Sequence, residues 1–105
     1  MLTREIAINT VKTFIAQCKE QQLIFDKVIL FGSVINGNIN QNSDIDVLLV
    51  SDKFGYSKWQ NAKLIAKVQK KFSLLDTHTY PTHYFETGDP FINEVMKTGV
   101  EISTF

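Results

Sequence analysis

Two acidic residues separated by a single position, Asp44 and Asp46, open the apolar segment DIDVLLV. In a β-strand, alternate side chains share one face, so both carboxylates would project together while Ile45 packs on the other face. Their Cα atoms would lie roughly 6.6 Å apart, so the carboxylates could converge on one divalent cation or on two cations about 3.5–4 Å apart. Without a cation, carboxylates ~5 Å apart repel by about 3 kcal/mol at an effective dielectric constant of about 20.

The ligand chemistry of this pair favours a hard cation. Oxygen ligands with little nitrogen or sulfur nearby predict Mg²⁺, with Mn²⁺ as a substitute, rather than zinc. A calcium-binding loop that begins at Asn42 is excluded, because Val47 and Lys53 occupy the positions that require Gly and Glu. The remaining alternative is a solvated pair of acids on an edge strand that binds no ligand.

A third acid, Asp76, lies in the strand-like segment SLLDTHTY. If this strand lies beside the one that carries Asp44 and Asp46, Asp76 becomes a third metal ligand, or the base that takes a proton from an attacking hydroxyl. His78 would share the face of Asp76 and could contact a phosphate or the acceptor. A histidine at the surface, or partly buried without a role, is the alternative.

The turn LFGSVING follows a short apolar strand, and its backbone amides could cradle a phosphate. The spacing from Gly32 to Gly37 fits the first half of a P-loop, but Asn38 and Ile39 stand where Lys and Ser or Thr are required. A dinucleotide-binding fingerprint does not fit either. The alternative is that Gly32 only turns the chain and Ser33 caps a short helix.

Hydrophobic periodicity predicts the elements that position these residues. They are a helix over 3–22, a strand over 27–31, a polar loop over 36–43, a strand over 44–50, a helix over 57–71, a strand over 73–80, a helix from Pro90 to Gly99 and a short strand over 100–104. The side chains expected to point inward are Ile6, Val11, Phe14, Ile15 and Cys18 in the first helix, and Leu64, Ile65, Val68 and Phe72 in the second. The turn before Pro90 is expected to leave Glu86 and Asp89 solvated. This order predicts an α/β (α+β) fold, a mixed sheet of about four strands flanked by helices.

Bulk composition narrows the class of protein. With 105 residues, the chain is expected to form a single domain over 1–105. Acidic and basic residues balance at a net charge of zero, which argues against direct nucleic-acid binding. There is no membrane-length apolar run and no signal peptide, so a cytoplasmic protein without membrane contact is expected. Aromatic residues in and around the connectors predict a protein interface, with core-edge packing as the alternative: Phe54, Tyr56, Trp59, Tyr80, Tyr84 and Phe85.

Taken together, Gly32-Ser33, ten intervening residues and Asp44-Ile45-Asp46 form the arrangement G-S-x10-D-x-D. It resembles the nucleotidyltransferase superfamily that includes DNA polymerase β, and in particular its minimal nucleotidyltransferase (MNT) branch, over nearly the whole chain. The resemblance implies nucleotide-binding residues at Gly32, Ser33, Asn36 and Ser43. It implies that the catalytic and Mg²⁺-binding carboxylates, around one or two ions, are Asp44, Asp46 and Asp76.

Small domains of this kind are similar to the antitoxin half of HEPN–MNT toxin–antitoxin pairs. That resemblance implies transfer of AMP from ATP onto a tyrosine of a HEPN partner, within a homo- or hetero-oligomer. One departure stands out, because no Lys or Arg occurs between Lys27 and Lys53, where many members carry a basic residue after Gly-Ser. The alternative is therefore a catalytically weak or inactive nucleotidyltransferase-like antitoxin that acts by binding alone. Transfer to a small molecule such as an aminoglycoside is a weaker third hypothesis.

Overall fold

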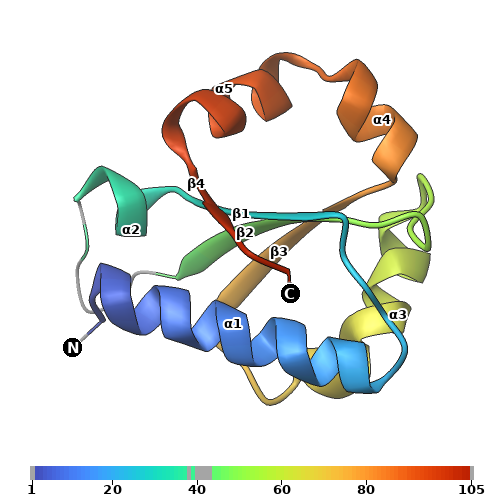
Figure 1. Ribbon diagram of the computed structural model, residues 1–105, viewed down its shortest axis with the longest axis horizontal. Helices are drawn as coiled ribbons and strands as arrows, with labels where there is room; N and C mark the ends of the chain where they lie inside the picture. Colours follow the sequence, from blue (N-terminus) through green and yellow to red (C-terminus); the bar gives the residue numbers. More distant parts are fainter. Residues whose placement is uncertain (1, 38, 40–43, 105) are drawn as a thin grey trace.

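A mixed four-stranded sheet organises the protein in a computed structural model that describes residues 2–37, 39 and 44–104 (Figure 1). Its strand order is β3-β2-β1-β4. The strands are β1 (Lys27–Phe31), β2 (Ile45–Val50), β3 (Leu75–Tyr80) and β4 (Val100–Ile102). The pair β2 and β3 is parallel, whereas β1 runs antiparallel to both β2 and β4. The predicted fold class, a mixed sheet flanked by helices, is confirmed.

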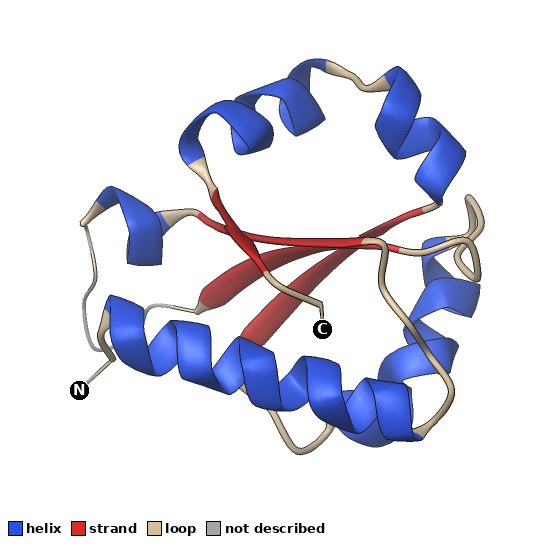
Figure 2. Cartoon of the chain, in the orientation of Figure 1, coloured by secondary structure: helices blue, strands red, loops and turns tan. Residues whose placement is uncertain are grey.

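Helices cover both faces of this sheet (Figure 2). They are α1 (Arg4–Glu20), α2 (Ser33–Asn36), α3 (Lys58–Gln69), α4 (Thr82–Thr87) and α5 (Pro90–Thr98). Helices α1 and α3 lie on one face, and α4 and α5 lie on the other. Among the residues described, no helix combines the length and the apolar character that a membrane span requires.

The two inner strands are buried on both faces, which explains their nearly continuous apolar sequences. On the α1 side, Val28, Val47 and Leu49 belong to a core that includes Phe14. On the other side, alternate residues of the same strands pack beneath α5, in a smaller cluster that contains Ile29, Leu48, Val50, Ile92 and Val95. Strand register is therefore strongly specified, because a slip by one residue would exchange these two sets.

Two side chains that periodicity placed inward are exposed instead. Ile6 is 49% exposed and Leu64 is 50% exposed. Each is adjacent in sequence to a residue of the buried stripe, Ala7 in α1 and Ile65 in α3. One residue of offset rotates a side chain by about 100° around a helix, so both leave the core-facing side.

Helix α4 was absent from the expected elements, and the short helix after Gly32, which was only an alternative to a phosphate cradle, is present as α2. Helix α2 takes in Asn36, the first residue of the loop predicted over 36–43. Gly32 turns the chain before it and is the N-cap of this single helical turn. Helix α4 has no side-chain cap at its start. It is held by tertiary contacts, since Tyr84 and Phe85 pack against the cluster beneath α5. A helix stabilised mainly by such contacts leaves little local sequence signal.

The aromatic residues of the connectors divide between core and surface. Phe54 is buried, and Tyr80 packs beside Tyr84 with their ring centroids 5.5 Å apart. Tyr56 and Trp59, in contrast, are 67% and 71% exposed. The interface hypothesis therefore applies to these two exposed residues, while the others have a structural role.

Gly99 offers a test of how tightly α5 is joined to the sheet. A Cβ atom at this position would lie 2.6 Å from Cγ2 of Ile29 and 2.6 Å from the Val95 carbonyl oxygen. We expect Gly99→Ala to lower the free energy of unfolding by about 1–3 kcal/mol, because a backbone contact cannot be relieved by a rotamer change. Chemical denaturation measures this. Gly55→Ala is the matched control, since a Cβ there would meet no atom within 4 Å, and an equal loss in both variants would contradict the packing argument.

Asp89 provides a pH-dependent test of the junction between α4 and α5. It was expected to be solvated, but its carboxylate caps α5 by accepting from the Ile92 amide and also accepts from the Tyr84 hydroxyl. The Ile92 amide, then the Tyr84 hydroxyl, hold the pKa of Asp89 below its usual value. A carboxyl with a lowered pKa in the folded state stabilises the fold above its unfolded-state pKa, and this contribution disappears as the pH falls through the folded-state pKa.

We therefore expect Asp89→Asn, which keeps an oxygen acceptor but loses the charge, to be less stable than the wild type at neutral pH. The difference should shrink as the pH is lowered from about 7 to about 3. Urea midpoints measured across this range test the expectation. A difference that stays constant with pH would show that the charge of Asp89 does not contribute.

Candidate active site

The parallel pairing of β2 and β3 brings Asp46 and Asp76 side by side, because these two residues are register partners. His78, two residues further along β3, extends from the same face. Its Nε2 atom lies 3.7 Å from Oδ1 of Asp46 and 3.7 Å from Oδ2 of Asp76. One ligand atom from each residue falls within 4.8 Å of the others, so the three side chains form one cluster.

The local sequence explains why charged groups occupy this face. Ile45 and Val47 alternate with Asp46 and are fully buried in the α1-side core. Burial of these two side chains forces Asp46 onto the opposite face. That face is covered by α5 further along the strand, at Leu48 and Val50. Nearer the start of the strand, Phe91 of α5 contacts Phe31 and His78. Asp46, the register partner of Phe31, lies beside this aromatic group.

The electrostatics of the cluster are unfavourable for a bare carboxylate. The side chain of Asp46 is only 27% exposed. Burial, followed by the neighbouring charge of Asp76, raises the pKa of Asp46, and His78 opposes the rise in part. Nε2 of His78 is itself buried and has no hydrogen-bond partner among the described residues. A positive charge placed between these groups would satisfy all three.

These donors fit a divalent cation. Two carboxylates and an imidazole nitrogen can all ligate a metal, and the unsatisfied Nε2 atom lies among the carboxylate oxygens. The expectation of oxygen ligands without nitrogen does not describe this cluster, because His78 is part of it. An imidazole is also a good ligand for zinc, so the donor types by themselves leave Mn²⁺ and Zn²⁺ as competitors of Mg²⁺.

Gly32 lies against the cluster and requires glycine for two reasons. Its φ is +81°, in the region that L side chains rarely adopt, and a Cβ atom there would overlap Oδ2 of Asp46. Gly32 is also the N-cap of α2, and Ser33 is the first helical residue rather than the cap. Asn36 ends α2 and is exposed. The predicted nucleotide-binding residue Ser43 lies outside the described residues.

Asp44, the first acid of the D-x-D motif, is placed differently from Asp46. It immediately precedes β2 and is exposed. It does not belong to the cluster of Asp46, Asp76 and His78. It lies outside β2, so its side chain is not held by the strand as that of Asp46 is. The structure thus unites two of the three predicted carboxylates and adds a histidine that sequence reasoning had assigned only to phosphate or acceptor contact.

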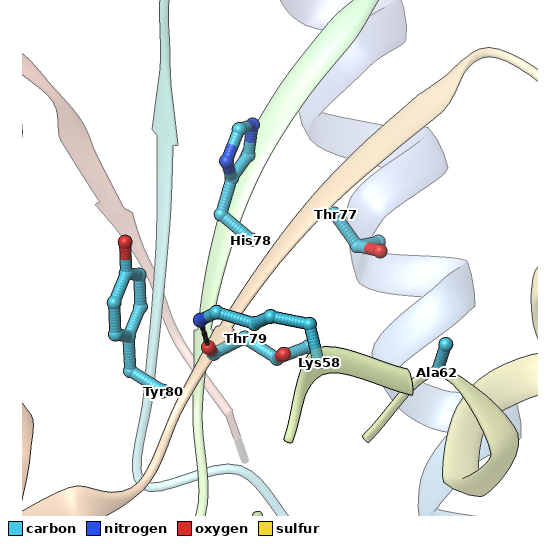
Figure 3. A pocket seen from close by; sticks show the side chains of 6 residues that line it. All are labelled: Lys58, Ala62, Thr77, His78, Thr79 and Tyr80. Carbon is cyan, nitrogen blue, oxygen red and sulfur yellow. Dashed lines mark hydrogen bonds between the residues drawn. The ribbon is translucent and has the colours of Figure 1, made fainter. Parts of the chain in front are cut away.

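A cavity of about 250 Å³ adjoins His78 on the outer side of β3 (Figure 3). Lys58 reaches into it from α3, donates to the Thr79 carbonyl and lies 3.6 Å from the centroid of the Tyr80 ring. Burial, offset by the charge of Asp89, lowers the pKa of Lys58. No sequence signal linked Lys58 to the site, because its position follows from the packing of α3 on β3.

A second cation stands near the Gly-Ser turn. The guanidinium of Arg4, at the start of α1, donates to the Ile35 carbonyl in α2 at 3.0 Å. The absence of Lys or Arg from the segment after Ser33 had suggested a turn without nearby positive charge. Arg4 supplies that charge from a distant part of the chain, which a search of adjacent residues cannot detect.

Comparison of this sequence with known proteins identifies a family that matches most of the chain. Residues 11–100 match the family described as "Nucleotidyltransferase domain". A Methanocaldococcus jannaschii protein named "Putative protein adenylyltransferase" is 38% identical over 79 residues, which cover 73% of this chain and 78% of that protein.

A solved structure shares the same architecture. The crystal structure of a "putative nucleotidyltransferase" from Sulfolobus solfataricus superposes with a TM-score of 0.67, covering 93% of this chain and 80% of that chain. At 17% identity, this likeness shows the fold. The family match runs from within α1 to the first residue of β4 and includes the Gly-Ser turn and the acidic cluster. The chain therefore belongs to the nucleotidyltransferase domain family.

Proposed function

We propose that this protein transfers AMP from ATP to a hydroxyl group of a partner protein, with Mg²⁺ bound at the acidic cluster. The observation that carries the proposal is the pairing of Asp46 with Asp76 around an unsatisfied His78 nitrogen, beside the glycine turn. The name of the Methanocaldococcus jannaschii relative, a protein adenylyltransferase, supports a protein acceptor. A tyrosine of a HEPN-type toxin is the acceptor that the MNT resemblance favours, and it would make this protein an antitoxin.

Each residue near the cluster has a proposed part in binding. The amides at Gly32 and Ser33, together with Asn36 and Ser43, would hold the phosphates of ATP. Asp46, Asp76 and His78 would hold the metal, and Asp44 would complete its ligands from the exposed end of β2. When bound, Mg²⁺ neutralises phosphate charge and stabilises the pyrophosphate leaving group.

The protein's own contribution is mainly positioning. Nucleotidyl transfer needs a hydroxyl in line with the leaving group and little covalent help from the enzyme. Asp76 is the more exposed of the paired carboxylates, at the open side of the cluster. It is therefore also the proposed acceptor of the hydroxyl proton, in addition to its part in holding the metal, whereas the more buried Asp46 would serve in metal binding alone.

An antitoxin that acts by binding alone is the second candidate. It is favoured by the absence of Lys and Arg between Lys27 and Lys53. The cation nearest the turn, Arg4, already donates to the Ile35 carbonyl. Under this hypothesis the acidic cluster is an inherited feature, and inhibition of the partner depends only on the contact surface.

We expect Asp46→Asn to reduce AMP transfer by about 10²–10³-fold, because a preorganised charge at the reacting phosphate is lost. The measurement is labelling of the protein encoded beside this one, with α-labelled ATP and Mg²⁺. The variant should fold at least as stably as the wild type, since burial disfavours the charged form of Asp46. Partner inhibition that persists unchanged in Asp46→Asn would instead support the binding-only antitoxin.

Substitutions of His78 and of Asp44, measured side by side, test which of these two side chains binds the metal together with Asp46 and Asp76. If His78 is a ligand, His78→Gln should lower transfer more than Asp44→Asn does. If Asp44 is a ligand and His78 is not, the order should reverse. Lys97→Gln, at an exposed residue of α5, is a control in which transfer should stay at the wild-type level.

Metal binding should also be visible without any substrate. A ligand that binds only the folded state, at about 100 times its Kd, stabilises that state by about 2.7 kcal/mol. We expect MgCl₂ or MnCl₂ to raise the Tm of the wild type and to have no such effect on Asp46→Asn. Sodium chloride at equal ionic strength controls for screening. An equal rise in Tm for both proteins would place the metal elsewhere, and a rise with ZnCl₂ alone would identify the imidazole as the deciding ligand.

A further inference from the structure

The positive charge of this neutral protein is strongly concentrated. Residues 53–75 contain six of its eleven Lys and Arg residues and no Asp or Glu. The six are Lys53, Lys58, Lys63, Lys67, Lys70 and Lys71. Their segment includes α3 and its C-cap at Lys70. The remainder of the chain is correspondingly acidic, so the charge neutrality that argued against direct nucleic-acid binding conceals a cationic helix.

These lysines are available to a partner. All six are exposed. Among the described residues, one ion pair joins a lysine or arginine to a carboxylate. It is Lys27–Glu101, between β1 and β4, and it involves none of the six lysines. Within α3, Lys67 follows Lys63 at a spacing of four residues, an arrangement of like charges that destabilises an isolated helix. An opposing acidic surface would relieve this repulsion.

Three of the lysines form a stripe with an exposed tryptophan. Trp59, Lys63, Lys67 and Lys70 follow one another at steps of four, four and three residues, so they share one side of α3. The buried residues Asn61, Ile65 and Val68 lie on the opposite side. Nζ of Lys63 lies 5.0 Å from the Trp59 ring centroid. We call the stripe of Trp59, Lys63, Lys67 and Lys70, together with Lys58, the α3 lysine face.

Helix α3 runs alongside the strand that carries Asp76 and His78, with the Trp59–Lys70 stripe on its outward side and Lys58 on the side that reaches the strand. Near the start of α3, Lys58 donates to the Thr79 carbonyl, and near its end, Gln69 donates to the Leu75 carbonyl. Helix α3 is thus antiparallel to β3 and lies along its outer edge. Lys58, drawn in Figure 3, extends over this edge into the cavity that His78 also lines. A second cavity, of about 330 Å³, shares Lys58 and Tyr80 and continues to Tyr56 and Tyr84.

The geometry of in-line attack determines which substrate approaches the site from the β3 edge of the sheet. If the proposed function holds, the phosphates of ATP lie toward Gly32, which follows β1. Strand β3 lies on the other side of β2, at the edge of the sheet. In an in-line displacement the attacking hydroxyl approaches opposite to the leaving pyrophosphate. The acceptor must therefore enter from the β3 edge, past Lys58.

We infer that the α3 lysine face docks an acidic segment of the acceptor protein, and that Lys58 guides this segment toward the cluster. The inference rests on the proposed function for the role of the occupant, and on the charge of α3 for its chemistry. Exposed Trp59 and Tyr56 supply the aromatic anchors that protein interfaces favour. The one arginine of the chain, Arg4, lies on α1 and not on this face, and arginine is the residue that nucleic-acid sites most often use for base contacts.

Binding to defined polymers tests the docking surface independently of catalysis. The probe is a glutamate–tyrosine copolymer, compared with a lysine–tyrosine copolymer of equal length, in buffer without ATP or divalent metal. The wild type should bind the acidic copolymer at least about tenfold more tightly. The triple variant Lys63→Gln, Lys67→Gln, Lys70→Gln should lose about tenfold in affinity.

A matched triple variant removes the same charge elsewhere. Lys12→Gln, Lys19→Gln, Lys97→Gln changes exposed lysines of α1 and α5. It should stay within about twofold of the wild type, because the charges lie off the docking face. Equal losses in both triple variants would show that only bulk charge matters, and would overturn the inference. Tighter binding of a uridine oligoribonucleotide than of the acidic copolymer would overturn it too, in favour of an RNA site.

Catalysis then separates this inference from the proposed function. With ATP and Mg²⁺, the α3 triple variant and Lys58→Met should raise the KM for the acidic copolymer by about tenfold, while the matched control does not. Copolymer docking without AMP transfer in the wild type would contradict the proposed function and leave the docking surface standing. AMP transfer with an unchanged KM in the α3 triple variant would contradict the docking surface and leave the proposed function standing.

Discussion

Two carboxylates held side by side on neighbouring parallel strands are the constraint from which the rest of the site follows. The register of β2 and β3 pairs Asp46 with Asp76, and burial of Ile45 and Val47 on the opposite face prevents β2 from turning Asp46 away. Apolar packing thus forces together two groups that repel each other. Burial first, and the charge of Asp76 second, raise the pKa of Asp46, and Nε2 of His78 has no hydrogen-bond partner among the described residues. A divalent cation bound there would reduce the charge repulsion and give the His78 nitrogen a partner. The arrangement that lowers the stability of the metal-free protein is therefore the one that favours metal binding.

The glycine turn is the second half of this arrangement, because it decides what can approach the metal. Phe31 ends β1 as the register partner of Asp46, and Gly32 follows it with a φ that L side chains rarely adopt. Any side chain at Gly32 would occupy the space of the Asp46 carboxylate. The backbone of the turn therefore lies directly against the acidic cluster. A phosphate bound between them would contact amide groups on one side and the cation on the other, which is the juxtaposition that nucleotidyl transfer needs.

The sequence predicted the sheet and the main helices because burial imposes periods of two and 3.6 residues that can be counted directly. It also singled out the two acids that the sheet brings side by side, Asp46 through its spacing from Asp44 and Asp76 because an acid there departs from the pattern of its strand. Helix α4 escaped prediction because tertiary packing, rather than periodicity, stabilises it, whereas the Gly-Ser turn indicated the short helix α2 only as an alternative to a phosphate cradle. The cations at Lys58 and Arg4 escaped as well. Each approaches the site from a helix distant in sequence, and only three-dimensional packing brings them near.

The distribution of charge links the two candidate functions. An enzyme that modifies a protein must bind a surface much larger than one hydroxyl group, and a binding-only antitoxin needs that surface alone. In this chain the acidic cluster and the outward lysines of α3 lie on opposite faces of the sheet, so the proposed chemistry and the proposed partner binding would be spatially separate. Lys58 is the residue that connects them, with its stem on α3 and its ammonium group in the cavity beside His78. Both hypotheses use α3 to bind the partner. Loss of the acidic cluster during evolution would therefore end catalysis without ending inhibition. Substitution of a single aspartate could then convert an AMP-transferring antitoxin into one that acts by binding alone.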